Sequence, residues 1–505
     1  MLQQCYNRRF GIDTACGASR SVIYLTRGDE MSRGSYLTGA AVALALVYTS
    51  AQAEGKDPLP DSLSLGGVTI YGTVDVGYAY QSKGVPLNST FPGGLEYQAF
   101  TTTRNFAGSV STAAESGLEQ SKIGIRVAEP IAEDWTLVAR LETGFNPLSG
   151  HLTDACLSIA QNGGVKQGGQ TANADSSRCG QAFNSVLFGG VSNKDFGTLT
   201  IGRQNSLQLE ALAQFDPQAL SYAFSFLGYS GFNGGAGSTQ GARWDNAVKY
   251  AYQNGPIHIA GMYSNGAQDG GLFGHAYGAN VGGAYAGLAV DAVYENEKGV
   301  VNLRSSFDDP ANPIPSPGLN SYVSDNTSWN LMGKYTFEFG GGGPQASATA
   351  DKLTVYAGYS HMQKSHFDYT SGEAQGAYQI TVPININTPA VYNMEWVGVR
   401  FALASGLSFT GAFYHVSQNS WTIGLGTTGT NNIGCSAAGL LCAGDFNEGS
   451  VVADYAFNKH YDLYAGVNYS EVTDGLANGF AGTTKDGTTG SENQTTVMFG
   501  FRVRF

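Results

Sequence analysis

Apolar and polar residues alternate along most of the chain from residue 68 onwards. In VTIYGTVDVGYAY (68–80) the even positions carry mainly valine, isoleucine and tyrosine, while Thr69, Thr73 and Asp75 occupy odd positions. A strand turns successive side chains to opposite faces, so this order gives one apolar face, whereas in a helix it would scatter around the axis. The alternation recurs in WTLVARLETGF (135–145) and EWVGVRFAL (395–403). The pattern predicts a protein built from strands that are apolar on one face.

Sixteen segments show this alternation, and the gaps between them follow a rule. Successive gaps are 40, about five, 39, six, 43, three, 11, three, 30, 12, 29, three, 28, three and 22 residues, so long and short gaps alternate strictly. A membrane barrel places short turns at one rim and long loops at the other. The segments are 68–80, 121–129, 135–145, 185–191, 198–203, 247–253, 257–264, 276–284, 288–296, 327–339, 352–363, 393–403, 407–417, 446–457, 461–471 and 494–505.

The gap rule and the even strand number predict an all-β fold, a 16-stranded antiparallel transmembrane β-barrel with long outer loops and short periplasmic turns. Lipid cannot hydrogen-bond an open sheet edge, and closing the barrel removes that edge. The alternative is a soluble or surface-fibre β-protein with glycine-rich loops, which would bury the apolar face. Charges on the polar face favour a water-filled interior instead. They are Asp75, Arg126, Arg140, Glu142, Lys249, Lys334, Arg400 and Asp454.

Composition agrees with a barrel. Charged residues make up 13% of the chain, against about 25% in a typical soluble domain. A mean hydropathy of −0.15 excludes a helical membrane protein. So few charges also argue against a long disordered chain. Strands in which apolar and uncharged polar residues alternate account for both the low charge content and the moderate mean hydropathy.

The first 67 residues divide into segments that precede the barrel. Arg33, an apolar core from about Tyr36 to Val47 and the sequence Ala51-Gln52-Ala53 follow the order of a secretory signal peptide, cleaved after Ala53. A membrane anchor is the alternative, but the core is shorter than the ~20 residues that span a bilayer. Because a signal peptide begins a protein, Met31 is the expected start. The expected division is an upstream extension (1–30), a signal peptide (31–53), a short N-terminal segment (54–67) and the barrel (68–505).

Charge and cysteine content narrow the partners of the mature chain. Without residues 1–53 it carries two more negative charges than the −13 of the whole sequence, which excludes nucleic-acid binding through bulk charge. An even number of cysteines remains, compatible with disulfides in an exported protein. No histidine lies at ligand spacing beside these cysteines, so a zinc site is a poorer explanation for them than disulfide bonds. Sequence neighbours suggest the pairs Cys156–Cys179 and Cys435–Cys442.

Five stretches resemble the Gram-negative general diffusion porin family. They cover the first six strands and the last, and the middle is similar in strand rhythm. The resemblance implies a homotrimer in the outer membrane with a passive, water-filled pore narrowed by an inward-folded third loop. It also implies outer-membrane lipid, lipopolysaccharide, the barrel assembly machinery, ions and small hydrophilic solutes as partners. The stretches are IYGTVDVGY (70–78), SKIGIRVAEPIAEDWTLVARLETGFN (121–146), FGTLTIGRQ (196–204), ARWDNAVKYAY (242–252) and FGFRVRF (499–505).

By this resemblance the third loop is residues 204–246, and its acidic groups face basic residues on the barrel wall. Opposed charges in a narrow, poorly screened passage orient polar solutes and bias ion selectivity. A plain wall ion pair, such as Arg140 with Glu142, is the alternative. The preferred ion sign stays open at this stage. The loop acids are Glu210 and Asp216, and the wall candidates are Arg126, Arg140, Arg203, Arg243 and Lys249.

Two features depart from the family pattern, the tip of the third loop and the start of the chain. About 14 residues (54–67) precede the first strand, whereas family members begin almost at the strand. The third loop lacks the compact Pro-Glu-Phe-Gly-Gly-type tip of enteric porins, so the tip is not transferable. Arg203 shares strand parity with Leu199 and Ile201, so it points inward only if the strand bulges. The second loop (146–184) is long enough to reach a neighbouring subunit.

The last strand, TTVMFGFRVRF (495–505), predicts barrel closure. Alternate apolar residues ending in Phe505 would face lipid. The resemblance implies that this aromatic C-terminus is read by the assembly machinery and that the strand pairs with the first one. Arg502 and Arg504 would face the wet interior near the periplasmic mouth, below the constriction.

Competing functions leave few traces in the sequence. No G-x-S-x-G, H-E-x-x-H or glycine-rich phosphate loop is present, so we expect no enzyme activity and no cofactor or metal. His361 and His366 are expected to be solvated rim residues. A substrate-specific channel for a sugar or organic anion remains an alternative, with aromatic residues of 222–232 as a stacking surface, and so does an adhesin with large loops such as 418–445.

Overall fold

In the computed structural model, the described residues form a single β-barrel unit. Both candidate disulfide pairs and the segments 1–30 and 31–53 lie outside the described residues. No helix within the described ranges is long and apolar enough to span a bilayer. The structure describes residues 63–82, 109–153, 181–230, 242–265, 275–304, 320–339, 350–367, 374–375, 378–379, 384–425, 431–433, 443–474 and 491–505.

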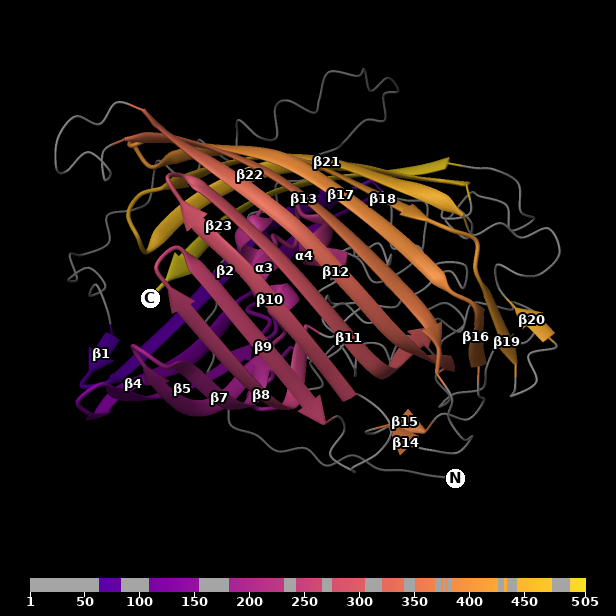
Figure 1. Cartoon of the computed structure of the whole chain (residues 1–505). Helices are drawn as coiled ribbons and strands as arrows, with labels where there is room; N and C mark the ends of the chain where they lie inside the picture. The colour runs from indigo at the N-terminus through magenta and orange to yellow at the C-terminus, as the bar shows by residue number, and fades with distance from the viewer. Residues whose placement is uncertain are drawn as a thin grey trace, which may run out of the picture. The chain divides into compact units, whose positions relative to one another are not determined.

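Sixteen of the described strands close into an antiparallel barrel, which confirms the predicted fold (Figure 1). Each strand pairs with its neighbour in chain order, and the last pairs with the first, with Val74 opposite Val503. All sixteen predicted segments coincide with strands. These are β2 (Val68–Gln81), β4 (Lys122–Ala132), β5 (Trp135–Gly144), β6 (Val186–Asn193), β7 (Gly197–Asn205), β8 (Arg243–Asn254), β9 (Ile257–Asn265), β10 (His275–Tyr285), β11 (Leu288–Arg304), β12 (Asn320–Phe339), β13 (Asp351–His366), β17 (Ala390–Ala402), β18 (Leu407–Gln418), β21 (Gly444–Ala456), β22 (Tyr461–Thr473) and β23 (Ser491–Arg504).

Short turns join these strands at one rim. Between β10 and β11 the turn residues Ala286 and Gly287 both have positive φ, 49° and 86°, as a two-residue hairpin with the twist of its strands requires. Between β6 and β7 the Asn193 side chain accepts hydrogen bonds from the backbone N–H groups of Asp195 and Phe196. These local devices fix the register of each hairpin.

Further strands and helices lie outside the sixteen. The strand β1 (Leu63–Leu65) folds back on the start of β2. The strand β3 (Val110–Glu115) pairs with β2 directly beyond β4, so β3 and β4 form one interrupted barrel strand. The sequence did not predict β3, because VSTAAE has almost no bulky apolar residue. The remaining elements are α3 (Leu207–Phe215), α4 (Phe226–Ser230), β14 (Ala374–Gln375), β15 (Tyr378–Gln379), β16 (Ile384–Thr388), β19 (Thr422–Leu425) and β20 (Asn431–Ile433).

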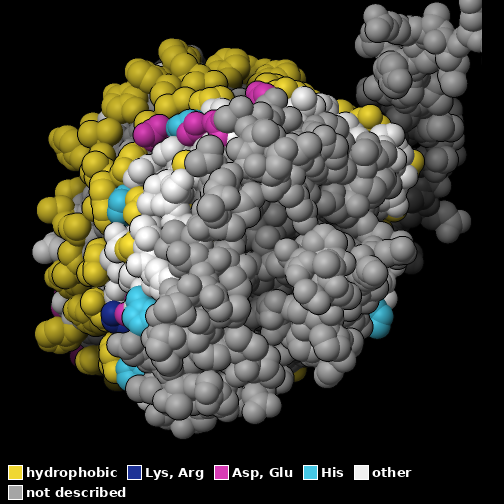
Figure 2. Space-filling model, turned by 90° about the vertical axis from the view of Figure 1, so that its right-hand side faces the viewer, with side chains coloured by type: hydrophobic (Ala, Val, Ile, Leu, Met, Phe, Trp, Pro, Cys, Tyr) yellow, Lys and Arg dark blue, Asp and Glu magenta, His cyan; other side chains and the backbone are white. Residues whose placement is uncertain are grey.

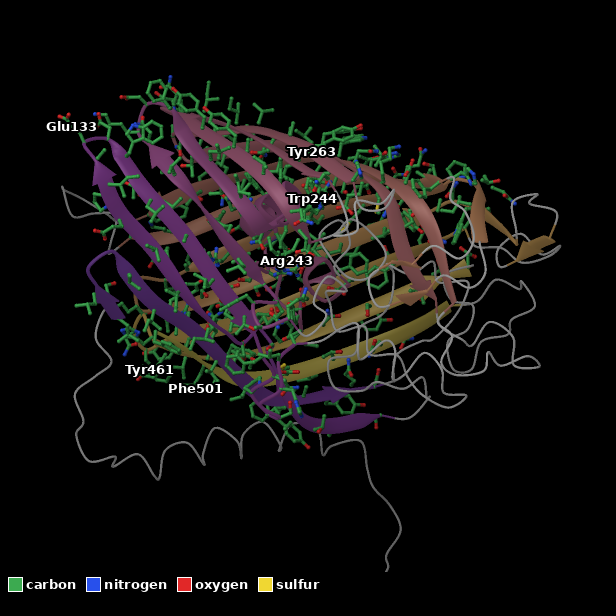
Figure 3. The ribbon with its side chains drawn as sticks, turned by 90° about the horizontal axis from the view of Figure 1, so that it is seen from below. Glu133, Arg243, Trp244, Tyr263, Tyr461 and Phe501 are labelled. Carbon is green, nitrogen blue, oxygen red and sulfur yellow. The ribbon has the colours of Figure 1, made fainter. Side chains whose placement is uncertain are left out.

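The outer face of the barrel is apolar, as the alternation predicts. Figure 2 shows hydrophobic side chains gathered over the outside of the wall. Aromatic pairs mark the short-turn rim, as expected of a girdle at a membrane interface. Tyr461 and Phe501, both on the outside in Figure 3, stack with their ring centroids 6.1 Å apart. Other pairs there are Trp135 with Phe196, Tyr335 with Phe337 and Tyr455 with Phe457.

The seam of the barrel is closed by the terminal phenylalanine. Phe505 and Gly72 exchange two backbone hydrogen bonds, 2.9 and 3.0 Å long. The Phe505 ring lies directly over Gly72, since a Cβ added there would come within 2.5 Å of it. The glycine therefore makes room on the outer face for the last side chain of the protein.

The interior is partly dry, which differs from the wet interior expected from the strand charges. Residues 206–230, which follow β7 and carry α3 and α4, lie inside the barrel (Figure 1). Its apolar side chains pack against inward residues of the wall. The buried cluster, here called the apolar compartment, includes Leu207, Leu212, Phe215, Phe226, Met332, Met362, Tyr392, Met394, Trp396, Tyr414, Trp421 and Phe446.

Candidate channel constriction

The helix α3 is specified by its own short sequence, LQLEALAQF. Ser206 caps its N-terminus, where the hydroxyl accepts a hydrogen bond from the N–H of Leu209. Buried residues recur at helical spacing on one face, with Leu207, Ala211, Leu212 and Phe215 all 1–3% exposed. The opposite face, with Glu210 and Gln214, lines an open cavity. The helix thus separates packed protein from solvent.

Wall residues anchor both ends of α3. At its start, the N–H of Gln208 donates to the buried carboxylate of Glu295 on β11, with 3.1 Å between N and Oε1, a favourable position for an acid at a helix N-terminus. At its end, the indole N–H of Trp396 on β17 donates to the carbonyl of Phe215 at 3.1 Å. Because these partners lie on different strands, they fix the axis of the helix inside the barrel.

Asp216, one of the two predicted loop acids, is buried just after α3. Its carboxylate accepts hydrogen bonds from the hydroxyls of Tyr414 (2.5 Å) and Ser225 (2.6 Å) and from the N–H of Leu220 (2.7 Å). Burial raises the pKa of Asp216 above its usual value, although these hydrogen bonds act in the opposite direction. Asp216 is therefore a hub that ties the segment after α3 to β18, and it is 2% exposed.

A cavity of about 720 Å³ lies between the exposed face of α3 and the barrel wall. Besides Glu210, the helix contributes Leu209, Ala213 and Gln214 to its lining. We call it the charged cavity, because six basic and four acidic residues line it. They are Lys122, Arg140, Arg243, Arg400, Arg502 and Arg504, with Glu119, Glu142, Glu210 and Asp454.

Arg140 forms a hydrogen-bonded network with Tyr71 and Glu142 on the barrel wall. One guanidinium nitrogen lies 2.6 Å from Glu142 Oε2, and its Nε donates to the hydroxyl of Tyr71 at 2.7 Å. The Tyr71 hydroxyl in turn donates to Glu142 at 2.9 Å. Arg126 lies opposite Arg140 in register, with its guanidinium carbon 5.6 Å from the centre of the Tyr71 ring. Arg140 lines the charged cavity, whereas Arg126 lies beside it.

The predicted pair of loop acid and wall base meets directly at β8. The Nζ of Lys249 lies 2.6 Å from Oε1 of Glu210. The side chain of Lys249 is only 12% exposed, so the ion pair ties α3 to the wall. Arg243, at the start of the same strand, lines the charged cavity. Figure 3 labels Arg243 and Trp244, which both lie in the interior.

Arg203 lies apart from these residues, at a bulge between β7 and β8. The register shifts after Gly202, and the residue is 8% exposed. One guanidinium nitrogen lies 2.8 Å from the carboxylate of Asp245, and another donates to the carbonyl of Asn184 at 2.8 Å. The sequence left open whether β7 contains a bulge, and the structure contains one. At this bulge Arg203 binds Asp245 and Asn184.

Several charged residues that line the cavity were not among the residues predicted for the constriction. Arg502 and Arg504, placed by sequence below the constriction, line the charged cavity together with Arg140 and Glu210. Both bind the fully buried Asp462, with nearest distances of 3.0 and 2.5 Å. Strand parity alone identified these residues as inward, but their height depends on the tilt of β23. The others are Lys122, Glu119, Glu142, Arg400 and Asp454, and Lys122 stands in the SKIGIRV stretch.

A second cavity of about 390 Å³ lies beside the charged cavity, between α3 and the wall strands β7 to β11. Lys194, Asn193 and Gln253 line it from the short-turn end, together with the pair His258 and Asp291, 3.1 Å apart. Glu210 and Gln214 line both cavities. The exposed face of α3 therefore borders both cavities.

Comparison with protein families gives a match over most of the chain. A family model described as Gram-negative porin matches residues 40–475. No curated protein sequence matches the chain.

Solved structures resemble the barrel at low sequence identity. The anion-selective porin from Comamonas acidovorans is 14% identical with a TM-score of 0.48, covering 87% of this chain and 99% of that one. The outer membrane channel DcaP of Acinetobacter baumannii is 13% identical with a TM-score of 0.46, covering 87% and 100%. Salmonella typhi OmpF, in a complex with daunomycin, is 14% identical with a TM-score of 0.42, covering 87% and 97%.

Proposed function

The chain belongs to the Gram-negative porin family, and we infer from this membership and from the charged cavity that its barrel is an outer-membrane channel for passive diffusion of ions and small hydrophilic solutes. The observation that carries the inference is the cavity itself, a polar space of about 720 Å³ inside a closed barrel with an apolar outer face. A closed barrel pairs the backbone of each strand with its neighbours, which a fold that spans a bilayer requires.

The constriction of this channel is the space between α3 and the charged wall. Glu210 and Gln214 form its loop side, and Arg140, Arg243 and Arg400 form part of the opposite side. A solute passing between them meets fixed charges at short range, where they act more strongly than in bulk water. We assign Arg126 and Lys249 a supporting role beside this passage. Arg203 and Asp216 serve to hold the wall and the loop in place.

The lining charges favour anions over cations. Six basic and four acidic residues leave a net charge of +2 in the charged cavity, although the whole chain carries −13. Charges on the outer loops are screened within about 8 Å at physiological salt. The lining charges therefore set the selectivity.

Planar-bilayer recording in a KCl gradient tests this function. The purified protein should give stable conductance steps with a reversal potential on the anion side. Replacing both Arg126 and Arg140 by Ser should move the reversal potential toward cation preference. A wild-type protein without conductance would refute the channel, and an unchanged reversal potential in the double variant would refute the role of these arginines.

The same recordings separate a general channel from the alternatives. A substrate-specific channel would show saturable block of its conductance by one solute, whereas a general channel shows none. We propose the general channel, without enzyme activity or cofactor. The polar, open lining carries charges at its wall rather than a single shaped pocket for one ligand.

We propose that the channel is a homotrimer and that Phe505 serves its assembly. The contact of Phe505 with Gly72 supports a role in closing the barrel. Deleting Phe505 should reduce the yield of assembled trimer far more than the conductance of those pores that form. Replacing Phe339, an aromatic residue 49% exposed on the outer face at the same rim, by Ala is the control. Normal trimer yield without Phe505 would contradict the proposal.

A further inference from the structure

The strand formed by β3 and β4 is interrupted by an insert, residues 116–121, that folds into the barrel. Its entry requires a left-handed residue, Ser116, with φ of +57°. Asp75 of β2, fully buried, organises the insert. One carboxylate oxygen accepts hydrogen bonds from the N–H groups of Leu118 and Glu119, both 2.9 Å long, and the other accepts from the Tyr464 hydroxyl at 2.6 Å. The insert is therefore built on the wall and has a fixed conformation.

The insert also holds the segment that follows α3. The carbonyl of Gly117 accepts hydrogen bonds from the hydroxyl of Ser221 (2.7 Å) and from the N–H of Ala223 (3.0 Å). Phe224 then packs edge-on against Tyr464, with ring centroids 6.4 Å apart. A side chain at position 117 would collide with the Tyr464 hydroxyl at 2.3 Å. The glycine thus permits the close approach of wall, insert and loop.

Glu119 carries the charge of the insert into the charged cavity. Its carboxylate lies 2.7 Å from Lys122 Nζ and 3.6 Å from a guanidinium nitrogen of Arg502. Burial raises the pKa of Glu119, but the neighbouring charges of Lys122 and Arg502 more than offset this and hold it below its usual value. Glu119 is therefore ionised at neutral pH beside two of the six lining cations.

We propose that the insert 116–121 is a second constriction element of the channel, which positions the third-loop segment through Gly117 and limits anion preference through Glu119. This inference rests on the proposed channel function and extends it. The third-loop acid Glu210 is paired with Lys249, away from the arginines of β23. Two carboxylates of the cavity lining come within 4 Å of Arg502, Glu119 of the insert at 3.6 Å and Asp454 of β21 at 3.7 Å. Glu119 is therefore the carboxylate through which the insert acts on selectivity.

Selectivity tests the role of Glu119. In bilayers with a KCl gradient, Glu119→Gln should raise the ratio of anion to cation permeability about four-fold. One unit charge roughly 10 Å from the ion path in water changes the permeability of each ion about two-fold, in opposite directions. Asp134→Asn removes the same charge from a turn residue paired with Lys194 and should leave the ratio unchanged. An unchanged ratio in Glu119→Gln overturns this part of the proposal.

Conductance and open-channel noise test the positioning role. Ser221→Ala removes the hydroxyl that donates to Gly117, and Asp75→Ala removes the acceptor of both insert N–H groups. Both changes should raise conductance and noise. Asp75→Asn keeps an oxygen acceptor and should restore quiet, wild-type-like steps. If Asp75→Ala does not assemble, Ser221→Ala decides, because it leaves the barrel wall intact.

The outcomes separate the inference from the function beneath it. A wild-type protein without conductance refutes the channel itself. If the wild type conducts, and Ser221→Ala and any assembled Asp75→Ala show the same conductance and noise as the wild type, only the positioning role is overturned. If Asp75→Asn is as noisy as Asp75→Ala, then the charge of Asp75 rather than its hydrogen bonds would matter, and the proposed clamp would be wrong.

Discussion

The apolar compartment and the charged cavity divide one barrel interior, and strand β17 runs through both. Its inward residues Tyr392, Met394 and Trp396 are each at most 1% exposed in the apolar compartment. Four residues beyond Trp396, Arg400 is exposed and lines the charged cavity. Between them Gly398 leaves room for Pro217, since an added Cβ would lie 2.3 Å from the proline ring. The same wall therefore serves packing over one stretch and solvent over the next.

The contrast separates what holds the third-loop segment from what selects the solute. Burial of large side chains against the wall contributes about 1.5–3 kcal/mol each, more than an exposed ion pair at about 0–1 kcal/mol. The loop is held chiefly by the apolar compartment. The cations that line the charged cavity can therefore set selectivity without also having to hold the loop. Substitutions in the two regions should have different effects.

The largest expected effect comes from the apolar compartment. Trp396→Ala removes a fully buried ring and the hydrogen bond to Phe215, which costs about 3–5 kcal/mol of stability. We expect a lower unfolding temperature, and a higher, noisier conductance because α3 loses its anchor. Trp329→Ala removes a ring that is 42% exposed on the outer face and should leave conductance unchanged. Equal conductance in the two variants would contradict the anchoring role.

A smaller effect is expected in the charged cavity. Arg400→Ser removes a lining cation and should shift the anion-to-cation permeability ratio toward cations by roughly four-fold, while the unfolding temperature stays close to that of the wild type. The matched control is Lys352→Ser, which removes a cation paired with Glu338 at the short-turn rim. A shift of the same size in the control would show that bulk charge, and not the cavity lining, sets selectivity.

The smallest effect concerns pH. The pKa of Glu119 is lowered, so its charge persists below about 4.3, the usual value for glutamate, and is lost as pH falls through the lowered value. The difference in selectivity between the wild type and Glu119→Gln should therefore persist at pH about 4.3 and vanish only when the pH falls below the lowered pKa of Glu119. Comparing these two proteins cancels the titration of other wall carboxylates. A difference that disappears above pH 5 would contradict the assigned environment.

Strand order and the two faces of the barrel could be predicted because each depends on residues close in sequence. Alternation such as that of 68–80 places side chains without knowledge of any partner. The length of each gap then separates turns from loops. The strand β3 escaped because six small residues carry no clear alternation.

The constriction could be predicted less completely, because it depends on heights and on buried partners. Parity placed Arg502 inside the barrel, but its neighbours Asp462 and Glu119 come from distant parts of the chain. The position of Asp216 in the third loop predicted a pore acid. Its burial could not be predicted, because it depends on Tyr414, which is 198 residues away in the sequence. The helix α3 had a local signal, a serine cap followed by apolar residues at helical spacing, which the surrounding alternation obscured.

Two adjacent residues of α3 test the central claim most directly. Leu212 is 1% exposed in the apolar compartment, and Ala213 lines the charged cavity. In a background without native cysteines, each is replaced by Cys and treated with a negatively charged, water-soluble thiol reagent while conductance is recorded. Ala213→Cys should react quickly, with a fall in conductance. Leu212→Cys should react about a hundred-fold more slowly, because its thiol must await a local opening of about 3 kcal/mol. Equal rates at the two positions would contradict the division of the interior into packed and aqueous regions.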